Sequence, residues 1–277
     1  MTTSSLSVAP AAATTVRKVT HRGVLRSEWA KFWSLRSSWI TLTVSVVVLL
    51  AFGAIAAYMY SPGAAAGDGP MSPEGSTDAV SLSLMGVGFA SLIVGSLGVL
   101  LFAGEYSTGM IRSTLAAVPR RLPVLFSKSA VVAALVLGLS TIGAFVAFQL
   151  GAVGLDGEKI ALSLGDDGVL RGLLGAGVYL ALVAVFGVAL GALLRSPAGG
   201  ITALVGILMI LPNLVSLLPA SLSDTLQPYF PSTAGEAVFA LHRSADSLSP
   251  GAGIAVFAGW VALALTAAAI RLKRTDA

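Results

Sequence analysis

Residues 172–194 read GLLGAGVYLALVAVFGVALGALL, and this stretch decides the fold class because it contains no charged side chain. About 20 consecutive apolar residues form a helix long enough to span the hydrocarbon core of a bilayer. Five more stretches without Asp, Glu, Lys or Arg are at least as long, and they cover residues 37–67, 79–104, 129–155, 196–223 and 247–270. The sequence therefore predicts six membrane-spanning segments.

The composition agrees with a membrane protein built from helices. Hydrophobic residues make up 56% of the 277 residues and charged residues only 11%, whereas roughly 25% of residues are charged in soluble domains. The apolar runs are long and unbroken, unlike the short alternating segments of a β-barrel. We expect an all-α integral membrane fold with helices at about 38–60, 80–103, 125–150, 170–194, 198–218 and 251–270.

The distribution of charge predicts the orientation of these helices. Lys and Arg concentrate in the cytoplasmic loops of membrane proteins. If the amino terminus is cytoplasmic, only Lys159, Arg171 and Arg243 of the 17 basic residues lie outside, and most of the 13 acidic residues lie outside as well. We therefore expect a multi-pass protein of the plasma membrane with both termini in the cytoplasm, including a carboxyl-terminal tail at 271–277.

The amino-terminal region divides into two parts. Residues 1–16 are rich in Ser, Thr and Ala, which predicts a disordered tail. Within residues 17–37, a helical period places Leu25, Trp29, Phe32 and Trp33 on one arc, with Lys31 on the opposite side. This pattern predicts an amphipathic helix at the membrane surface with its Trp rings at headgroup level. The alternative is an ordinary basic flank of the first span.

A short helix is also expected in the last external segment, 219–250. Thr233 and Glu236 have the spacing of a capping box. This spacing predicts a short helix from about 234 to 242, and the alternative is a plain loop.

Several classes of chemistry have no candidate residues in this chain. It contains no Cys, only two His and no G-x-x-x-x-G-K-[ST] motif. The central parts of the predicted helices carry no ionisable side chain, although ion-coupled carriers usually need one there. We expect no catalytic or metal site, no bound cofactor and no nucleic-acid partner.

The loop after the second predicted helix contains the one acidic residue of the internal loops between helices, Glu105. A buried carboxylate at that position needs a cationic partner, and we expect Arg112 or Arg120 to supply it. The alternatives are that Glu105 is solvated and that Arg120, Arg121 and Lys128 only fix the topology.

Three segments resemble the permease subunits of bacterial ABC-2 type transporters. They are Gly104-Glu105-Tyr106-x-x-Gly109-x-Ile111-Arg112 followed by Pro119-Arg120-Arg121 and Lys128, Arg26-Ser27-Glu28-Trp29-x-Lys31-x-x-Ser34-x-Arg36-Ser37, and Pro231-Ser232-Thr233-Ala234-Gly235. The layout of the whole chain is similar too, and the motifs carry weight only when taken together.

The resemblance implies a six-helix permease without enzymatic activity of its own. It implies a second permease subunit, identical or different, and a pair of cytoplasmic ATPase subunits that bind ATP and Mg²⁺. It also implies that the loop after helix two docks on the ATPase and that residues 22–36 form a connecting helix beside it. The residues that would couple the two proteins are Glu105, Tyr106, Gly109, Arg112, Arg120 and Arg121.

The same resemblance suggests that helices two and five line the substrate path, with Phe89, Phe102, Met209 and Asn213 as lining residues. The alternative is that these side chains pack between helices or face lipid. Because the helices are apolar, the expected cargo of such an exporter is an amphipathic or hydrophobic drug, lipid or peptide. The rival functions are an ATP-independent carrier or channel and a membrane anchor that recruits a partner.

Overall fold

A computed structural model describes residues 20–60, 78–118, 121–241 and 247–274, and these residues form helices joined by turns. Within these described residues, six helices are long and apolar enough to cross a membrane, which confirms the predicted all-α membrane fold. They are α2 (Arg36–Tyr58), α4 (Val87–Ser107), α6 (Leu122–Gly154), α7 (Val169–Leu194), the composite helix Pro197–Val215, and α12 (Pro250–Arg274).

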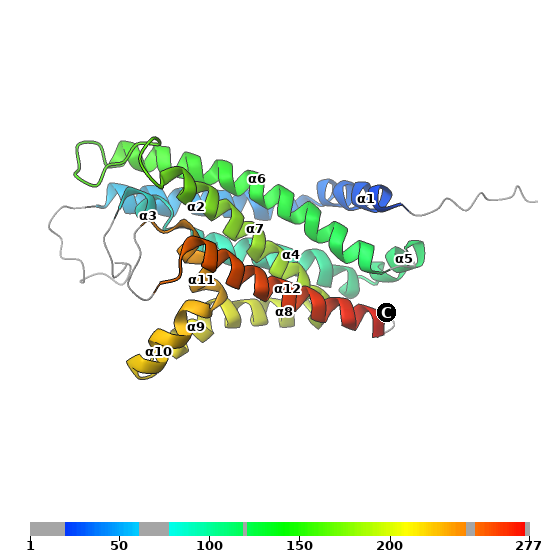
Figure 1. The fold of residues 1–277 in the computed structure, drawn as a ribbon. Coiled ribbons are helices and arrows are strands. Elements are labelled where there is room, and N and C mark those ends of the chain that lie inside the picture. Colours follow the sequence, from blue (N-terminus) through cyan, green and yellow to red (C-terminus); the bar gives the residue numbers. More distant parts are fainter. Residues whose placement is uncertain (1–19, 61–77, 119–120, 242–246, 275–277) are drawn as a thin grey trace, which may run out of the picture.

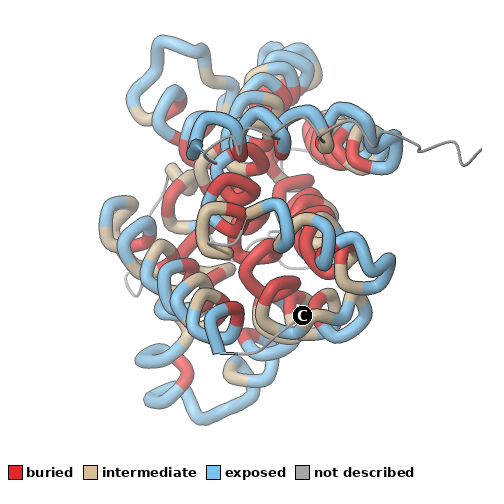
Figure 2. The backbone as a smooth tube through the Cα atoms, turned by 90° about the vertical axis from the view of Figure 1, so that its right-hand side faces the viewer, coloured by how far each residue is buried: buried red, intermediate tan, exposed pale blue. Residues whose placement is uncertain are grey.

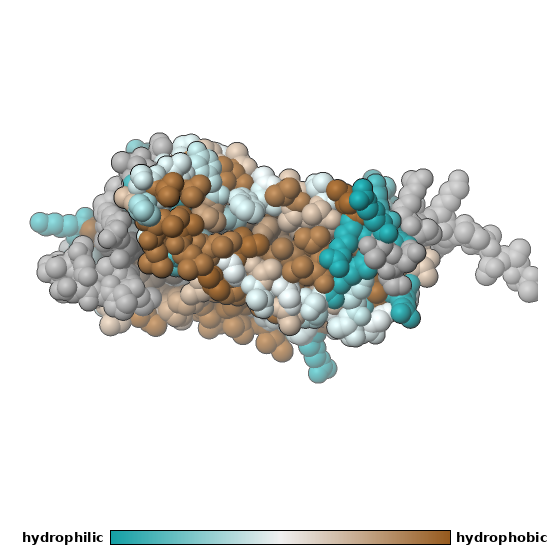
Figure 3. All heavy atoms as spheres, turned by 90° about the horizontal axis from the view of Figure 1, so that it is seen from below, coloured by the Kyte–Doolittle hydropathy of each residue, from teal (hydrophilic) through white to brown (hydrophobic). Residues whose placement is uncertain are grey.

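The helices run side by side in an elongated bundle (Figure 1). Helix α1 (His21–Ser34), helix α5 (Met110–Ala117) and the carboxyl-terminal end of α12 lie at the same end of this bundle. Seen from below, apolar side chains cover much of the middle of the molecule and a hydrophilic band lies at that end (Figure 3). This surface has the distribution expected of a protein whose middle contacts lipid.

Most residues of helix α7 are buried, more than in any other span among the described residues, and buried segments gather in the interior of the molecule (Figure 2). Helix α7 packs closely on α4, because a side chain at Gly98 would overlap the carbonyl oxygen of Ala184, and one at Gly187 would overlap that of Gly95. The Gly187-x-x-x-Gly191 pattern therefore marks close helix packing, as its spacing predicts.

The second predicted span is two helices rather than one. Helix α3 (Ala79–Ser83) begins at a capping box, in which the Asp78 carboxylate accepts hydrogen bonds from the backbone of Val80 and Ser81. The chain then turns at Gly86, whose Cα lies so close to α2 that an added Cβ would be 2.7 Å from the Cα of Leu49. Helix α4 starts after this turn.

The fifth span is irregular in its middle. It consists of α8 (Pro197–Val205), a π-helical turn at Gly206–Ile210 and α9 (Leu211–Val215). Pro212 has no N–H to donate, and the preceding Leu211 N–H bonds to Gly206, five residues back instead of four. The missing N–H of Pro212 thus coincides with a π-helical turn directly before it.

The third span is longer than the prediction of 125–150. Helix α6 contains 33 residues, and at ~1.5 Å per residue it is about 50 Å long, compared with a hydrocarbon core of ~30 Å. It therefore extends beyond the hydrocarbon, and Lys128 lies near its amino-terminal end, within the predicted helix.

The remaining boundaries also differ from those expected. The last external segment contains α10 (Ala220–Leu226), a 3₁₀ turn at Gln227–Tyr229 and α11 (Pro231–Phe239). Because α11 begins at Pro231 with Phe230 at its N-cap, Thr233 lies inside the helix and the expected capping box is wrong. At the two ends of the chain, α1 occupies part of the segment 17–37, α12 continues to Arg274, and the expected tail 1–16 lies outside the described residues.

Candidate functional site

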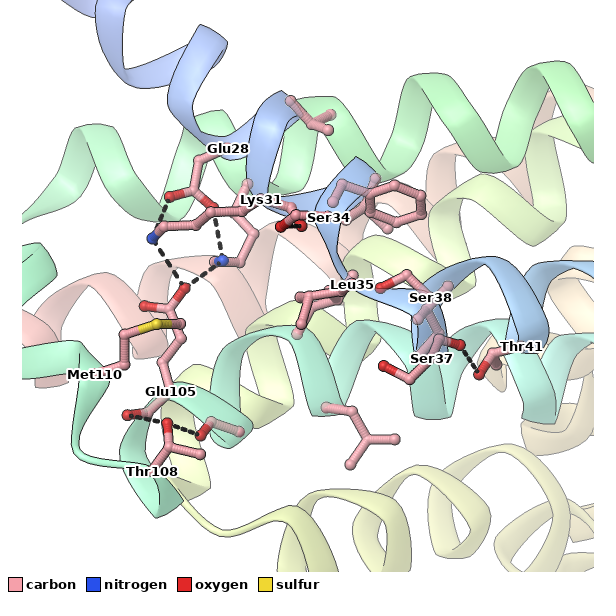
Figure 4. Close-up of a pocket in the computed structure, with 18 residues that line it drawn as sticks. Glu28, Lys31, Ser34, Leu35, Ser37, Ser38, Thr41, Glu105, Thr108 and Met110 are labelled. Atoms are coloured by element: carbon pink, nitrogen blue, oxygen red, sulfur yellow. Dashed lines mark hydrogen bonds and ion pairs between the residues drawn. The ribbon is translucent and has the colours of Figure 1, made fainter.

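Four charged side chains meet where α1, α4 and α6 come together (Figure 4). Lys128 Nζ lies 2.6 Å from Glu28 Oε2 and 2.8 Å from Glu105 Oε1. Lys31 Nζ lies 3.1 Å from Glu28 Oε1 and 3.2 Å from Glu105 Oε1. Each lysine therefore bridges both glutamates, and we call Glu28, Lys31, Glu105 and Lys128 the charge cluster.

The charge cluster is neutral and largely buried. The side chains of Glu28, Glu105 and Lys128 are 3%, 5% and 6% exposed, and that of Lys31 is 29% exposed. Partial burial alone would lower the pKa of Lys31, but the carboxylates of Glu28 and Glu105 outweigh it and hold that pKa above its usual value. Lys31 is therefore expected to be charged at neutral pH.

The two oxygens of the Glu105 carboxylate differ in their contacts. Its Oε1 accepts both lysines, whereas its Oε2 is buried and has no hydrogen-bond partner among the described residues. A cavity of about 300 Å³ lies beside the cluster and runs along the junction of α1 and α2, with Ser38 and Thr41 on its wall. The cluster thus borders open space on one side, and its carboxylate is not fully satisfied.

Helix α5 is attached to the charge cluster through both the backbone and a side chain. Gly109 ends α4 in a left-handed conformation with φ of 74°, which favours glycine, and this turn leads directly into α5. Thr114 of α5 receives a hydrogen bond from Lys31 Nζ at 3.2 Å, and Ile111 is buried in the core. A displacement of α5 therefore acts directly on α1 and α4.

Two arginines connect neighbouring helices at the end of the bundle that holds the charge cluster. The Arg195 guanidinium lies 4.9 Å from the centre of the Tyr106 ring, within the range of a cation–π contact. Arg121, at the start of α6, donates a hydrogen bond to the carbonyl of Leu272 in α12. Basic side chains near a helix carboxyl terminus satisfy its free carbonyls, so Arg121 has a structural role here.

The structure changes the partner that we expected for Glu105. The prediction that Glu105 is buried with a cation is confirmed, but its partners are Lys128 and Lys31 rather than Arg112. Arg112 is exposed on α5, because Ile111 beside it occupies the face that enters the core. Arg120, the other expected partner, lies outside the described residues.

The four apolar residues of the predicted surface helix separate into two groups. Leu25, Trp29 and Trp33 are exposed, whereas Phe32 is buried against the bundle. The buried face of α1 carries Glu28 as well. The helix therefore buries a face that holds charge and exposes an apolar stripe, the reverse of a soluble amphipathic helix.

A second hollow, of about 350 Å³, lies toward the opposite end of the bundle, where α4, α7, α11 and the kinked fifth span meet. It collects three of the four residues predicted to line a substrate path: Phe89, Met209 and Asn213. The fourth, Phe102, is 1% exposed, packs beside Tyr106 near the charge cluster and does not line this hollow.

Sequence reasoning missed three members of the charge cluster as site residues: Glu28, Lys31 and Lys128. Glu28 and Lys31 are three residues apart and so share one face of a helix. Lys128 stands between Ser127 and Ser129 at the start of a membrane span. Oppositely charged residues beside membrane spans were the available signal, because such groups are stable there only when paired.

No protein-family model matches the sequence, and no curated protein matches it. The resemblance to ABC-2 permeases therefore rests on the quoted residues and on the layout of the helices.

Proposed function

We propose that this chain is the membrane-spanning permease subunit of an ABC exporter whose ATP is hydrolysed by separate cytoplasmic ATPase subunits. The observation that carries the proposal is the charge cluster together with α5. Helix α5 is short, lies outside the spans and exposes Met110 and Arg112. It is connected to three longer helices, α1, α4 and α6, through Gly109, Thr114 and the charge cluster. This arrangement suits a docking element that receives movement from a partner.

The mechanism follows from these attachments. The ATPase pair docks on α5 when ATP and Mg²⁺ bind, and its closure displaces α5. Lys31 and Glu105 pass that displacement to α1 and α4, and Lys128 passes it to α6. Because paired charges in a low-dielectric setting are costly to separate, the three helices move together, and the hollow toward the outer end changes its shape. The end that carries α1, α5 and the carboxyl terminus is then the cytoplasmic one.

The assembly contains a second permease subunit, identical or different, and lies in the plasma membrane. Export of an amphipathic or hydrophobic cargo fits the apolar spans and the hollow between α4, α7 and α11.

Reversal of one exposed charge tests the docking role. Arg112→Glu alters a side chain that is exposed on α5, so the fold should persist while cargo-stimulated ATP hydrolysis and transport by the reconstituted complex fall at least about tenfold, the effect of ~1.4 kcal/mol. Lys273→Glu is the matched control, since it reverses an exposed charge at the same end of the bundle. Equal activity of the two variants would contradict the proposal, as would cargo movement by this chain without any ATPase.

A further inference from the structure

The hollow of about 350 Å³ toward the outer end of the bundle contains a carboxylate that forms no ion pair with the residues that the structure describes. Glu236 of α11 faces this hollow and is the single charged residue among the described residues that line it. No hydrogen bond or salt bridge joins its side chain to any other described residue. The protein around it desolvates the carboxyl and raises its pKa, although the side chain remains accessible from the hollow.

The polar groups beside Glu236 include several hydrogen-bond acceptors. The amide nitrogen of Asn213 already donates to the Met209 carbonyl at 2.6 Å, so its oxygen remains to accept a bond from a ligand. The hydroxyls of Ser232 and Thr233 also line the hollow, and hydroxyl groups can accept hydrogen bonds. A ligand that only donates would find several acceptors here.

Aromatic and apolar side chains form the rest of the wall. Phe89, stacked on Phe52 at 4.4 Å between ring centres, and Tyr179 present rings to the hollow, and Leu208 adds an aliphatic side. Rings of this kind attract cations as well as apolar groups. The Tyr179 ring packs against the backbone of Gly235, in the space that a side chain at Gly235 would need.

We propose that this hollow binds the primary ammonium group of an amphipathic amine, with Glu236 as its counter-ion and Asn213 as a hydrogen-bond acceptor. The proposal deepens the proposed function by naming the chemical class of the cargo. An ammonium offers three donors and no acceptor, and its charge would offset the cost of the unpaired carboxylate. The apolar part of the ligand lies against Phe89 and Leu208. The amine is either a free amphiphile or the headgroup of an aminophospholipid.

The test is equilibrium binding to the purified full chain in phosphatidylcholine nanodiscs, without any ATPase. The probe is 4-phenylbutylamine, and 4-phenylbutanol is its neutral counterpart. We expect the amine to bind at least about tenfold more tightly than the alcohol, and Glu236→Gln to remove most of that difference, since hydrogen bonds to charged groups are the stronger ones. Asp156→Asn, which removes an exposed charge outside the hollow, should leave amine binding unchanged.

A second arm distinguishes the two sources of the amine. If dihexanoyl phosphatidylethanolamine displaces the probe and dihexanoyl phosphatidylcholine does not, the site accepts a lipid headgroup; if neither displaces it, the site takes free amines. Equal binding of amine and alcohol, or equal amine binding by Glu236→Gln and the unchanged protein, would overturn the proposal. Melting curves show whether Glu236→Gln is folded, and Asn213→Leu provides a second variant that should weaken amine binding. Because no ATPase is present, a negative result leaves the docking role of α5 untouched.

Discussion

Replacing Lys128 by methionine should destabilise the protein far more than the same change at Lys31. Lys128 Nζ contacts Glu28 at 2.6 Å and Glu105 at 2.8 Å, and its side chain is only 6% exposed. Without it, two buried carboxylates share one lysine, and the cluster carries an uncompensated negative charge. Breaking a buried ion pair by removing one partner costs about 3–5 kcal/mol. Since Lys31 still compensates one carboxylate, we expect the lower end, about 3 kcal/mol.

The matched change, Lys31→Met, removes contacts of similar geometry from a side chain that is 29% exposed. Water can reach the remaining groups from that side, and partly exposed pairs contribute about 0–1 kcal/mol. The expected difference between the two lysine variants is therefore about 2 kcal/mol, although both remove one positive charge from the same two carboxylates.

The measurement is the free energy of unfolding of the purified protein in mixed micelles, followed by the loss of helical circular dichroism. The double variant Glu28→Gln with Lys128→Met restores neutrality and should recover part of the loss seen in Lys128→Met alone. If the two single lysine variants lose the same free energy, or the double variant is the sum of its parts, the charge cluster is not a coupled buried unit and the reasoning fails.

Three further predictions concern the charge cluster and two glycines of the helix bundle. Partial burial opposes the charged form of Lys31, but Glu28 and Glu105 outweigh it and raise the pKa of Lys31 above 10.5. The stabilising effect of Lys31 is therefore complete below that pH and is lost as the pH rises through the raised value, so the melting temperatures of the unchanged protein and Lys31→Met should converge only in alkaline solution. Gly109→Ala should cost about 1–2 kcal/mol of unfolding free energy in the same micelle assay, because its φ of 74° is strained for other residues. Gly98→Leu should prevent the close approach of α4 and α7 and yield protein that elutes as aggregate in size-exclusion chromatography, whereas Gly138→Leu, where an added Cβ meets nothing, should elute normally.

The sequence predicted the spans because hydropathy alone determines which segments can cross a bilayer. The interruptions of these spans depend on particular residues. Pro212 gave a usable signal for the irregular fifth span, since a missing N–H must disturb a helix. The turn at Gly86 gave none, because its cause is the close approach of α2, a contact that only the folded chain contains.

The site was less predictable because the helices are apolar on all sides. Phe89 and Phe102 both belong to α4, yet one faces the hollow and the other is fully buried. They are roughly 140° apart around the helix at ~100° per residue, but no polar stripe indicates which direction is the interior. For the same reason the sequence could not show that Glu105 pairs with Lys128 rather than with Arg112, because that pairing depends on the rotation of α6 relative to α4.

The order of the charge cluster along the chain bears on how the protein is made. Glu28 and Glu105 belong to segments that leave the ribosome before Lys128 does. When the amino-terminal turns of α6 reach the membrane, both carboxylates have already been synthesised, so the lysine can be neutralised as soon as α6 packs on α1 and α4. Synthesis of α6 as a separate fragment would place the same lysine at the edge of the bilayer without a counter-charge, which makes the preceding helices a condition for its stable insertion.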